Sequence, residues 1–312
     1  MRNALGAAGT MWAGALVVLC TCVVTGRVQG QVRGVYPLGM SAIGSGGLPA
    51  SGITYSNLFL FYSRNQLRGP DGELLATGRN SVLMDMNTVA WVSSARMLGG
   101  ARLSLSATIP IANNSLTSDT EGAVSGGGGL GDSFYQPVIL GWALARADLK
   151  AAYGFLAPTG RYGAGAADNV GSGYWTHTLS AGQTIYLTKD RATALSAFEM
   201  YEFHGTQEGT DVHPGQNLDL DYSLTHVLTL REDLRLQAGL VGYAQWQTTD
   251  KRGPSVTPAQ ATARYRVHAL GIASNLILPS RQVVLGFRYF DEFASRSTLQ
   301  GYSIQISAAI TF

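Results

Sequence analysis

The chain has 312 residues, of which only 13% are charged and 46% are hydrophobic; it contains 39 glycines and its formal net charge is +2. An ordinary globular domain carries about 25% charged residues and about 7% glycine, while disordered chains combine low hydrophobicity with high net charge, so neither class fits. After residue 30 no apolar run approaches the ~18 residues of a membrane-spanning helix, and the near-neutral charge gives no reason to expect a nucleic-acid partner. Apolar residues that are numerous but dispersed indicate alternation along strands.

The N-terminal residues 1–30 are predicted to be a cleaved secretory signal peptide. Arg2 supplies the positive charge, residues 4–24 form the apolar region, and Val28 and Gly30 are small residues before the cleavage point. The apolar region exceeds the usual length of about 7 to 15 residues, so an uncleaved anchor is the alternative. Both cysteines, Cys20 and Cys22, lie inside it, and the mature chain must therefore be stable without disulfides.

Residues 31–51 follow the signal peptide and are not predicted to form a strand. They contain the string VYPLGMSAIGSGGLP, which is apolar and rich in glycine but does not alternate. Two interpretations stay open for this N-terminal segment. If the rest of the chain forms a barrel, the segment could fold into the barrel mouth or lumen as a plug. The alternative is a loose periplasmic tail.

From residue 51 onward the dominant pattern has period two, the spacing of side chains on one face of a strand. In the string ARLSLSATIP, Leu103, Leu105 and Ile109 share one face, and Ser104 and Ser106 share the other. Twelve such segments are predicted. They lie near 52–64, 80–96, 101–110, 132–145, 147–157, 173–187, 192–204, 216–230, 234–249, 260–277, 282–294 and 298–312.

The connections between these segments alternate in length. Tight ones lie at 97–100, 146, 188–191, 231–233 and 278–281, and long polar ones at 64–79, 111–131, 158–172, 205–215 and 250–259. An even number of antiparallel strands with short turns at one rim and long loops at the other is typical of bacterial outer-membrane barrels. We therefore predict an all-β fold, a transmembrane antiparallel β-barrel of about 12 strands over residues 52–312, with short periplasmic turns and long extracellular loops.

Aromatic residues support a barrel over a soluble sandwich. Trp142, Trp175 and Trp246 lie near segment ends on the predicted outward face, where an aromatic girdle would meet the membrane interface. The terminal Phe312 closes an alternating apolar strand, the pattern that outer-membrane assembly machinery recognises. The expected partners are outer-membrane lipid, the barrel assembly machinery through the C-terminal strand, and small-molecule solutes.

Three motifs could in principle bind a cofactor or a metal or catalyse a reaction, but each has a better structural explanation. The spacing G-x-G-x-x-G at 126–131 lacks the preceding strand and following helix of a dinucleotide site. His177 and Ser180 are three residues apart on a strand and project to opposite faces, so they cannot act as base and nucleophile. His204 and His213, with Glu208 and Asp211 between them, could form a metal site, but they match no metal-ligand spacing and are better explained as part of a solvated polar loop. We expect no enzyme activity, no cofactor and no metal.

Polar and charged residues at the alternate strand positions predicted to face the barrel interior suggest a charged lumen. If the segments at 216–230 and 234–249 form a hairpin, Asp219 lies opposite Gln245 and Asp221 opposite Tyr243. In a parity-matched register, the next strand would place Arg264 opposite Gln245 and Arg266 opposite Tyr243. One interpretation is a constriction that orients polar or anionic solutes between opposed charges. The other is a buried salt-bridge network that fills the barrel.

Several strings together resemble a known family. They are GVYPLGMSAIGSGGLPASGITYSNLFLFYS at 34–63, GLGDSFYQPVILGW at 129–142, YGFLAPTGRY at 153–162, GYWTHTLSAGQTIYL at 173–187 and EGTDVHPGQNLDLDYSLTH at 208–226. They are similar to the putative MetA-pathway of phenol degradation family. The resemblance implies an outer-membrane barrel linked with uptake of aromatic or other hydrophobic compounds, and it assigns no catalytic or binding residues.

The functional expectation is passive uptake of small hydrophobic or aromatic compounds across the bacterial outer membrane. A barrel of eight strands is filled by its own side chains, and one of 16 to 18 strands encloses an aqueous channel, so about twelve strands predict a narrow, partly occluded path. The alternatives are a general porin for small hydrophilic solutes and a structural or surface-interaction barrel whose long loops bind partners.

Overall fold

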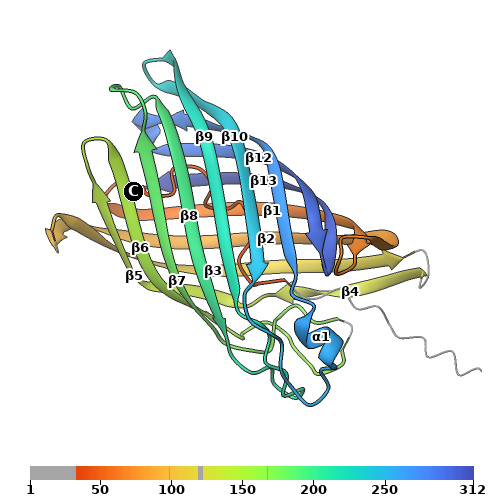
Figure 1. Cartoon of the computed structure of the whole chain (residues 1–312). Helices are drawn as coiled ribbons and strands as arrows, with labels where there is room; N and C mark the ends of the chain where they lie inside the picture. Colours follow the sequence, from red (N-terminus) through yellow and green to blue (C-terminus); the bar gives the residue numbers. More distant parts are fainter. Residues whose placement is uncertain (1–32, 98, 119–121, 167) are drawn as a thin grey trace, which may run out of the picture.

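The fold is a closed antiparallel β-barrel, as predicted (Figure 1). The computed structural model describes residues 33–97, 99–118, 122–166 and 168–312, and the predicted signal peptide lies outside them. β1 pairs with both β2 and β13, which closes the ring. The strands are β1 (Gly52–Arg68), β2 (Leu74–Met97), β3 (Ala101–Ser118), β4 (Gly122–Leu130), β5 (Ser133–Ala143), β6 (Ala147–Ala157), β7 (Thr176–Tyr186), β8 (Thr193–His204), β9 (Asn217–Arg231), β10 (Leu234–Gln247), β11 (Arg266–Leu278), β12 (Val283–Arg296) and β13 (Thr298–Thr311).

In the described part of the chain, thirteen strands occupy the twelve positions of the ring. The inner part of β3, residues 102–108, pairs with β5, and its outer part, residues 111–118, pairs with β4. β4 and β5 therefore lie end to end beside β3 and together fill one position of the ring. Two short helical segments lie in connections, α1 (Pro258–Thr262) and the 3-10 turn η1 (Pro279–Arg281). Neither of these described helices has the length and hydropathy to cross a membrane.

The connections confirm two distinct rims but differ from the sequence prediction in extent. Tight turns follow β5, β7, β9 and β11, whereas residues 158–175, 205–216 and 248–265 form long loops at the opposite rim. The predicted loop 64–79 is mostly strand, because β1 continues to Arg68 and β2 begins at Leu74. Much of the predicted loop 111–131 is also strand, formed by the end of β3 and by β4. Strand positions outside the bilayer need not carry apolar side chains, so the strands can continue beyond the region in which apolar and polar residues alternate.

The outer wall carries a belt of exposed apolar side chains, which a soluble protein would bury. Leu240, Ile272 and Leu179 are 62%, 57% and 55% exposed. Trp175 is also exposed, and Trp246 packs edge-on against His268, with ring centroids 5.5 Å apart. At the short-turn rim, the backbone N–H of Phe312 donates to the carbonyl of Ile53 at 2.8 Å, which joins the C-terminus to the first strand. Such a belt is the surface that lipid requires.

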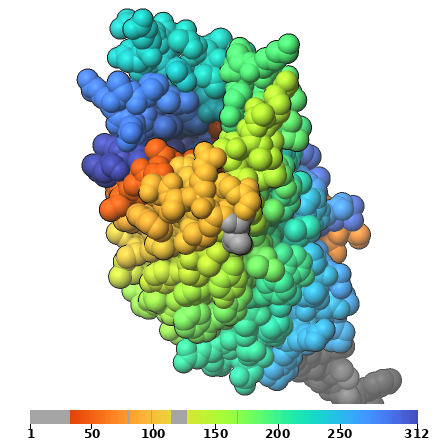
Figure 2. All heavy atoms as spheres, turned by 90° about the vertical axis from the view of Figure 1, so that its left-hand side faces the viewer, coloured from red at the N-terminus to blue at the C-terminus, as the bar shows by residue number. Residues whose placement is uncertain are grey.

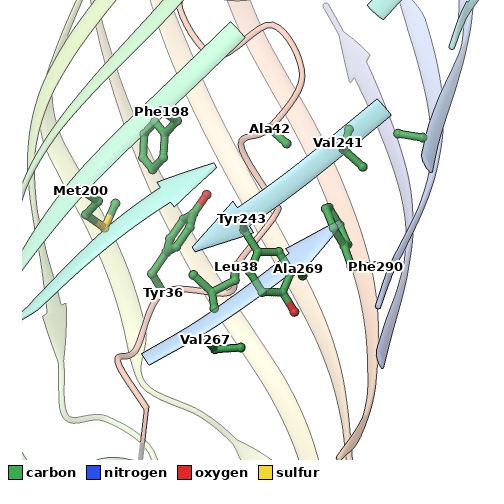
Figure 3. Close-up of a cluster of buried hydrophobic side chains, with 11 residues drawn as sticks. Tyr36, Leu38, Ala42, Phe198, Met200, Val241, Tyr243, Val267, Ala269 and Phe290 are labelled. Carbon is green, nitrogen blue, oxygen red and sulfur yellow. The ribbon is translucent and has the colours of Figure 1, made fainter. Parts of the chain in front are cut away.

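The core of the molecule is inside the barrel and includes the N-terminal segment, residues 33–49. Tyr36, Leu38 and Ala42 of this segment are buried. Figure 3 shows them packed among wall residues of four strands, namely Phe198 and Met200 of β8, Val241 and Tyr243 of β10, Val267 and Ala269 of β11, and Phe290 of β12. Seen from the left of Figure 1, the surface is hollowed between the orange start of the barrel and its blue final strands (Figure 2).

Candidate functional site

The predicted acidic pair lies in the lumen, opposite the predicted partners. In the register of β9 and β10, Asp219 pairs with Gln245 and Asp221 pairs with Tyr243, and all four side chains are fully buried. The Nε2 of Gln245 donates to Oδ1 of Asp219 at 2.6 Å. The tight turn after Arg231 fixes this register, because a two-residue connection leaves few ways to pair the strands. A role of these residues as a constriction stays a prediction.

The predicted positions of Arg264 and Arg266 are wrong. Gln245 pairs with Val267 and Tyr243 with Ala269, three residues further along the chain than expected. An odd shift exchanges the two faces of a strand. Arg264 lies before β11 and forms an exposed ion pair with Asp250 at 2.8 Å. The prediction assumed a polar inner face, but β11 presents Val267 and Ala269 inward because the apolar N-terminal segment packs there.

Asp221 holds the middle of the N-terminal segment. Its carboxylate accepts hydrogen bonds from the hydroxyl of Tyr36 at 2.6 Å, from the backbone N–H of Gly39 at 2.8 Å and from that of Ser41 at 3.0 Å. Burial, together with the neighbouring carboxylate of Asp221, raises the pKa of the Tyr36 phenol, which therefore stays protonated as a donor. The buried charge of Asp221 is thus satisfied by the segment itself.

Two further carboxylates bind the beginning of the segment. Glu202 on β8 accepts from the backbone N–H groups of Val35 at 3.1 Å and Tyr36 at 2.7 Å. Glu292 on β12 forms a two-pronged ion pair with Arg33, in which the second contact is 2.9 Å, and also accepts from the hydroxyl of Tyr243 at 2.8 Å. Bidentate pairs of this kind fix orientation as well as contributing energy. The lumen therefore recognises the segment through carboxylates on three strands.

Close backbone approach fixes the path of the segment at two glycines. Gly39 has φ +83°, a conformation that favours glycine, and a Cβ there would overlap the ring of Phe290. On the wall, a Cβ at Gly182 of β7 would overlap the carbonyl of Ser45. The next residue of the segment, Gly46, donates its N–H to Thr184 Oγ1 at 3.1 Å. These contacts bring the segment against β7 before it enters β1.

A cavity of about 580 Å³ remains between the N-terminal segment and the wall formed by β2, β3, β5, β6, β7 and β8. Its size lies within the range of about 300–1,000 Å³ found for small-molecule sites. Apolar and hydroxyl side chains share its lining. The apolar ones include Met84, Met86, Phe134, Ile139, Leu156 and Met200, and the hydroxyl ones include Thr88, Ser104, Ser106 and Thr108.

At the long-loop rim, three of the five strings that carry the family resemblance lie around one carboxylate. Asp132, the last residue of GLGD, accepts from the N–H of Gly160 in APTGRY at 2.9 Å. It also accepts from the N–H and the hydroxyl of Ser172, both at 2.7 Å, directly before GYWTH. Asp132 thus ties the loop 158–175 to the start of β5, and it borders the cavity. Asp132 therefore helps to fix the position of this loop beside the cavity.

His177 and His204 lie on opposite faces of the barrel wall, the first exposed and the second buried. His177 pairs with Phe155 on the outer face and accepts or donates a 2.9 Å hydrogen bond with the Tyr153 hydroxyl, whereas Ser180 lies on the other face. His204 is buried beside Thr176 and Asn217. No group of three or more His, Cys, Asp or Glu among the described residues lies close enough together to hold a metal ion.

The sequence prediction missed the charged residues that contact the segment or the cavity most directly. Glu202, Glu292 and Lys150 all have inward parity on strands that were correctly located, and that parity was the available signal. Their roles depend on the path of the segment, which alternation does not reveal.

A closed barrel with an apolar outer belt and a largely filled lumen defines an outer-membrane, channel-type β-barrel, located in the bacterial outer membrane. The chain belongs to the family described as "Putative MetA-pathway of phenol degradation", whose family model matches residues 64–308. No curated protein matches significantly.

One solved structure of an outer-membrane protein is similar in fold, and a second matches more weakly. The COG4313 outer membrane channel from Pseudomonas putida F1 has a TM-score of 0.69 at 14% identity, and the match covers 85% of this chain and 97% of that one. The β domain of the Bordetella autotransporter BrkA has a TM-score of 0.47 at 13% identity, covering 84% of this chain and 100% of that one. The first similarity supports the barrel fold.

Proposed function

We propose that this barrel admits small hydrophobic or aromatic compounds across the outer membrane by passive diffusion. The observation that carries the proposal is the 580 Å³ cavity, which combines methionine, leucine, isoleucine and phenylalanine side chains with hydroxyl groups. Flexible methionines suit apolar ligands of varied shape. The description of the family to which the chain belongs refers to phenol degradation, and this supports an aromatic compound as the solute.

The N-terminal segment is proposed to be a plug that narrows this path. Its residues 36–42 lie against the half of the lumen formed by β8–β13, and the cavity lies in the other half. Carboxylates of Glu202, Asp221 and Glu292 hold it from three strands. A solute would then pass between the segment and the opposite wall, whose lining combines apolar and hydroxyl side chains.

Swelling of proteoliposomes tests the proposed function. The full-length mature chain is reconstituted, and influx is compared for benzoate, benzyl alcohol and a monosaccharide. Faster permeation of the two aromatic solutes than of the sugar is the expected result. Equal permeation of all three would instead support a general channel for hydrophilic solutes, which the hydroxyl groups of Ser104, Ser106 and Thr108 favour. No permeation of any would contradict transport and leave a structural role.

Assembly is proposed to depend on the last strand. β13 pairs with β1 and β12 and is followed by the exposed Phe312. Replacing Phe312 with Ala should lower the amount of folded barrel in the outer membrane, measured by heat-modifiable migration. An equal yield of folded variant and parent would refute a role of this residue in assembly.

A further inference from the structure

Lys150 is an ammonium group without a carboxylate partner at the edge of the lumenal cavity. It lies on β6 with inward parity and lines the cavity. Its only recorded contact among the described residues is with the ring of Phe198, whose centroid is 5.7 Å from Nζ. No ion pair or hydrogen bond joins it to another described side chain.

The wall around Lys150 is bare. It pairs with Gly141 of β5 on one side and with Gly182 of β7 on the other, so no neighbouring side chain projects into the lumen at its level. Leu48 and the backbone of Ser45, both in the N-terminal segment, pack on these two glycines. The ammonium is therefore framed by apolar groups and backbone at the end of the cavity nearest the short turns.

The other charged residues that line the cavity are already satisfied. Arg33 is paired with Glu292. Glu202 accepts from the backbone of the N-terminal segment, and Asp132 accepts from the loop at the mouth. Lys150 is thus the charged lining residue, within the described part of the chain, whose charge the protein does not neutralise.

We propose that Lys150 binds the anionic group of amphipathic solutes, and that the cavity selects small aromatic or aliphatic carboxylates and phenolates. An ionisable group within a membrane-spanning region that has no structural partner points to function. A partly desolvated cation gains most from an anion that also covers the adjacent apolar surface of the cavity, here Met200 and Ile139. This inference rests on the proposed function, because it names the chemical class of the solute.

Equilibrium binding tests the site separately from transport. Benzoate, acetate and benzyl alcohol are titrated by calorimetry, at pH 7, into the detergent-solubilised, full-length mature barrel. We expect benzoate to bind about tenfold more tightly than either acetate, which lacks the ring, or benzyl alcohol, which lacks the charge. In Lys150→Met the benzoate affinity should fall about tenfold, while Lys150→Arg should retain most of it.

The control is Lys189→Met, which removes one positive charge from an exposed turn. It should leave benzoate binding unchanged. Unaltered benzoate affinity in Lys150→Met would overturn the assignment, as would equal affinities of acetate and benzoate, because the second result describes an anion site without selection for an apolar body.

Swelling assays then separate the two proposals. If benzoate binds through Lys150 but no aromatic solute permeates, the site stands and the transport proposal fails. If benzyl alcohol permeates and benzoate binding is independent of Lys150, the transport proposal stands and the anion site fails.

Discussion

Replacing Asp221 with Ala should detach the centre of the N-terminal segment from the wall. The substitution removes the acceptor of three hydrogen bonds, from Tyr36, Gly39 and Ser41, at 2.6, 2.8 and 3.0 Å. Bonds to a charged group each contribute about 1.5–3 kcal/mol, and two of these share one oxygen. Three bonds at the lower end of this range give about 4.5 kcal/mol, and because two of them share an oxygen we take roughly 4 kcal/mol, which corresponds to a shift of about a thousandfold in the docking equilibrium.

Amide hydrogen exchange and single-channel conductance read out this change. Protection of the Gly39 and Ser41 amides should fall by up to about a thousandfold, and conductance should rise because residues 36–41 no longer narrow the lumen. Residues 33–35 should stay protected, because Arg33 remains paired with Glu292 and the N–H of Val35 still donates to Glu202.

The matched control is Asp219→Ala. Asp219 is equally buried and lies two residues away on the same face, but the hydrogen bond that it accepts at 2.6 Å comes from Gln245 of the wall. It should leave segment protection and conductance close to those of the parent protein. The reasoning is refuted if the Asp221 variant keeps full protection, or if both variants raise conductance equally, because the effect would then reflect lumenal charge alone.

Three other substitutions probe the segment, the mouth and the outer wall. Gly39→Ala should weaken the binding of the N-terminal segment to the barrel wall more than Gly44→Ala does. Both glycines have positive φ, but only a Cβ at Gly39 would overlap the ring of Phe290. Hydrogen exchange of the segment amides measures this difference, and equal exchange in the two variants would contradict the prediction. Asp132→Ala should make the loop 158–175 far more sensitive to protease, because it removes the carboxylate that accepts from Gly160 and Ser172. The control is Asp168→Ala, which removes an exposed ion pair in the same loop that is expected to contribute less than about 1 kcal/mol. Equal digestion of the two variants would contradict the proposed anchoring by Asp132. Leu240→Arg should destabilise the folded barrel in phospholipid vesicles by about 2–4 kcal/mol, and unchanged stability would show that this side chain does not face lipid.

The outer face of the barrel was predictable because lipid imposes one rule on it. Side chains such as Leu179, Leu240 and Ile272 must be apolar, so alternation located all twelve strand positions and the two rims. Where strands extend past the bilayer, as in β1 and β2, that rule ends and the predicted boundaries fell short.

The inner face was less predictable because its chemistry depends on what occupies the lumen. Asp219 and Asp221 were placed correctly, since a tight turn sets the register of β9 and β10. Arg264 and Arg266 were misplaced because the prediction required polar residues inside, whereas Val267 and Ala269 face the apolar N-terminal segment. The contacts of that segment join residues far apart in sequence, which strand periodicity cannot encode.

Deleting residues 33–49 tests the central claim most directly, namely that the N-terminal segment occludes a barrel otherwise wide enough to conduct. The deletion variant and the parent are compared by single-channel conductance in planar bilayers, after heat-modifiable migration has shown that both are folded. We predict a severalfold rise in conductance and entry of sugars excluded by the parent, because twelve strands enclose more space than their own side chains fill. Unchanged conductance in a folded deletion variant would contradict the account.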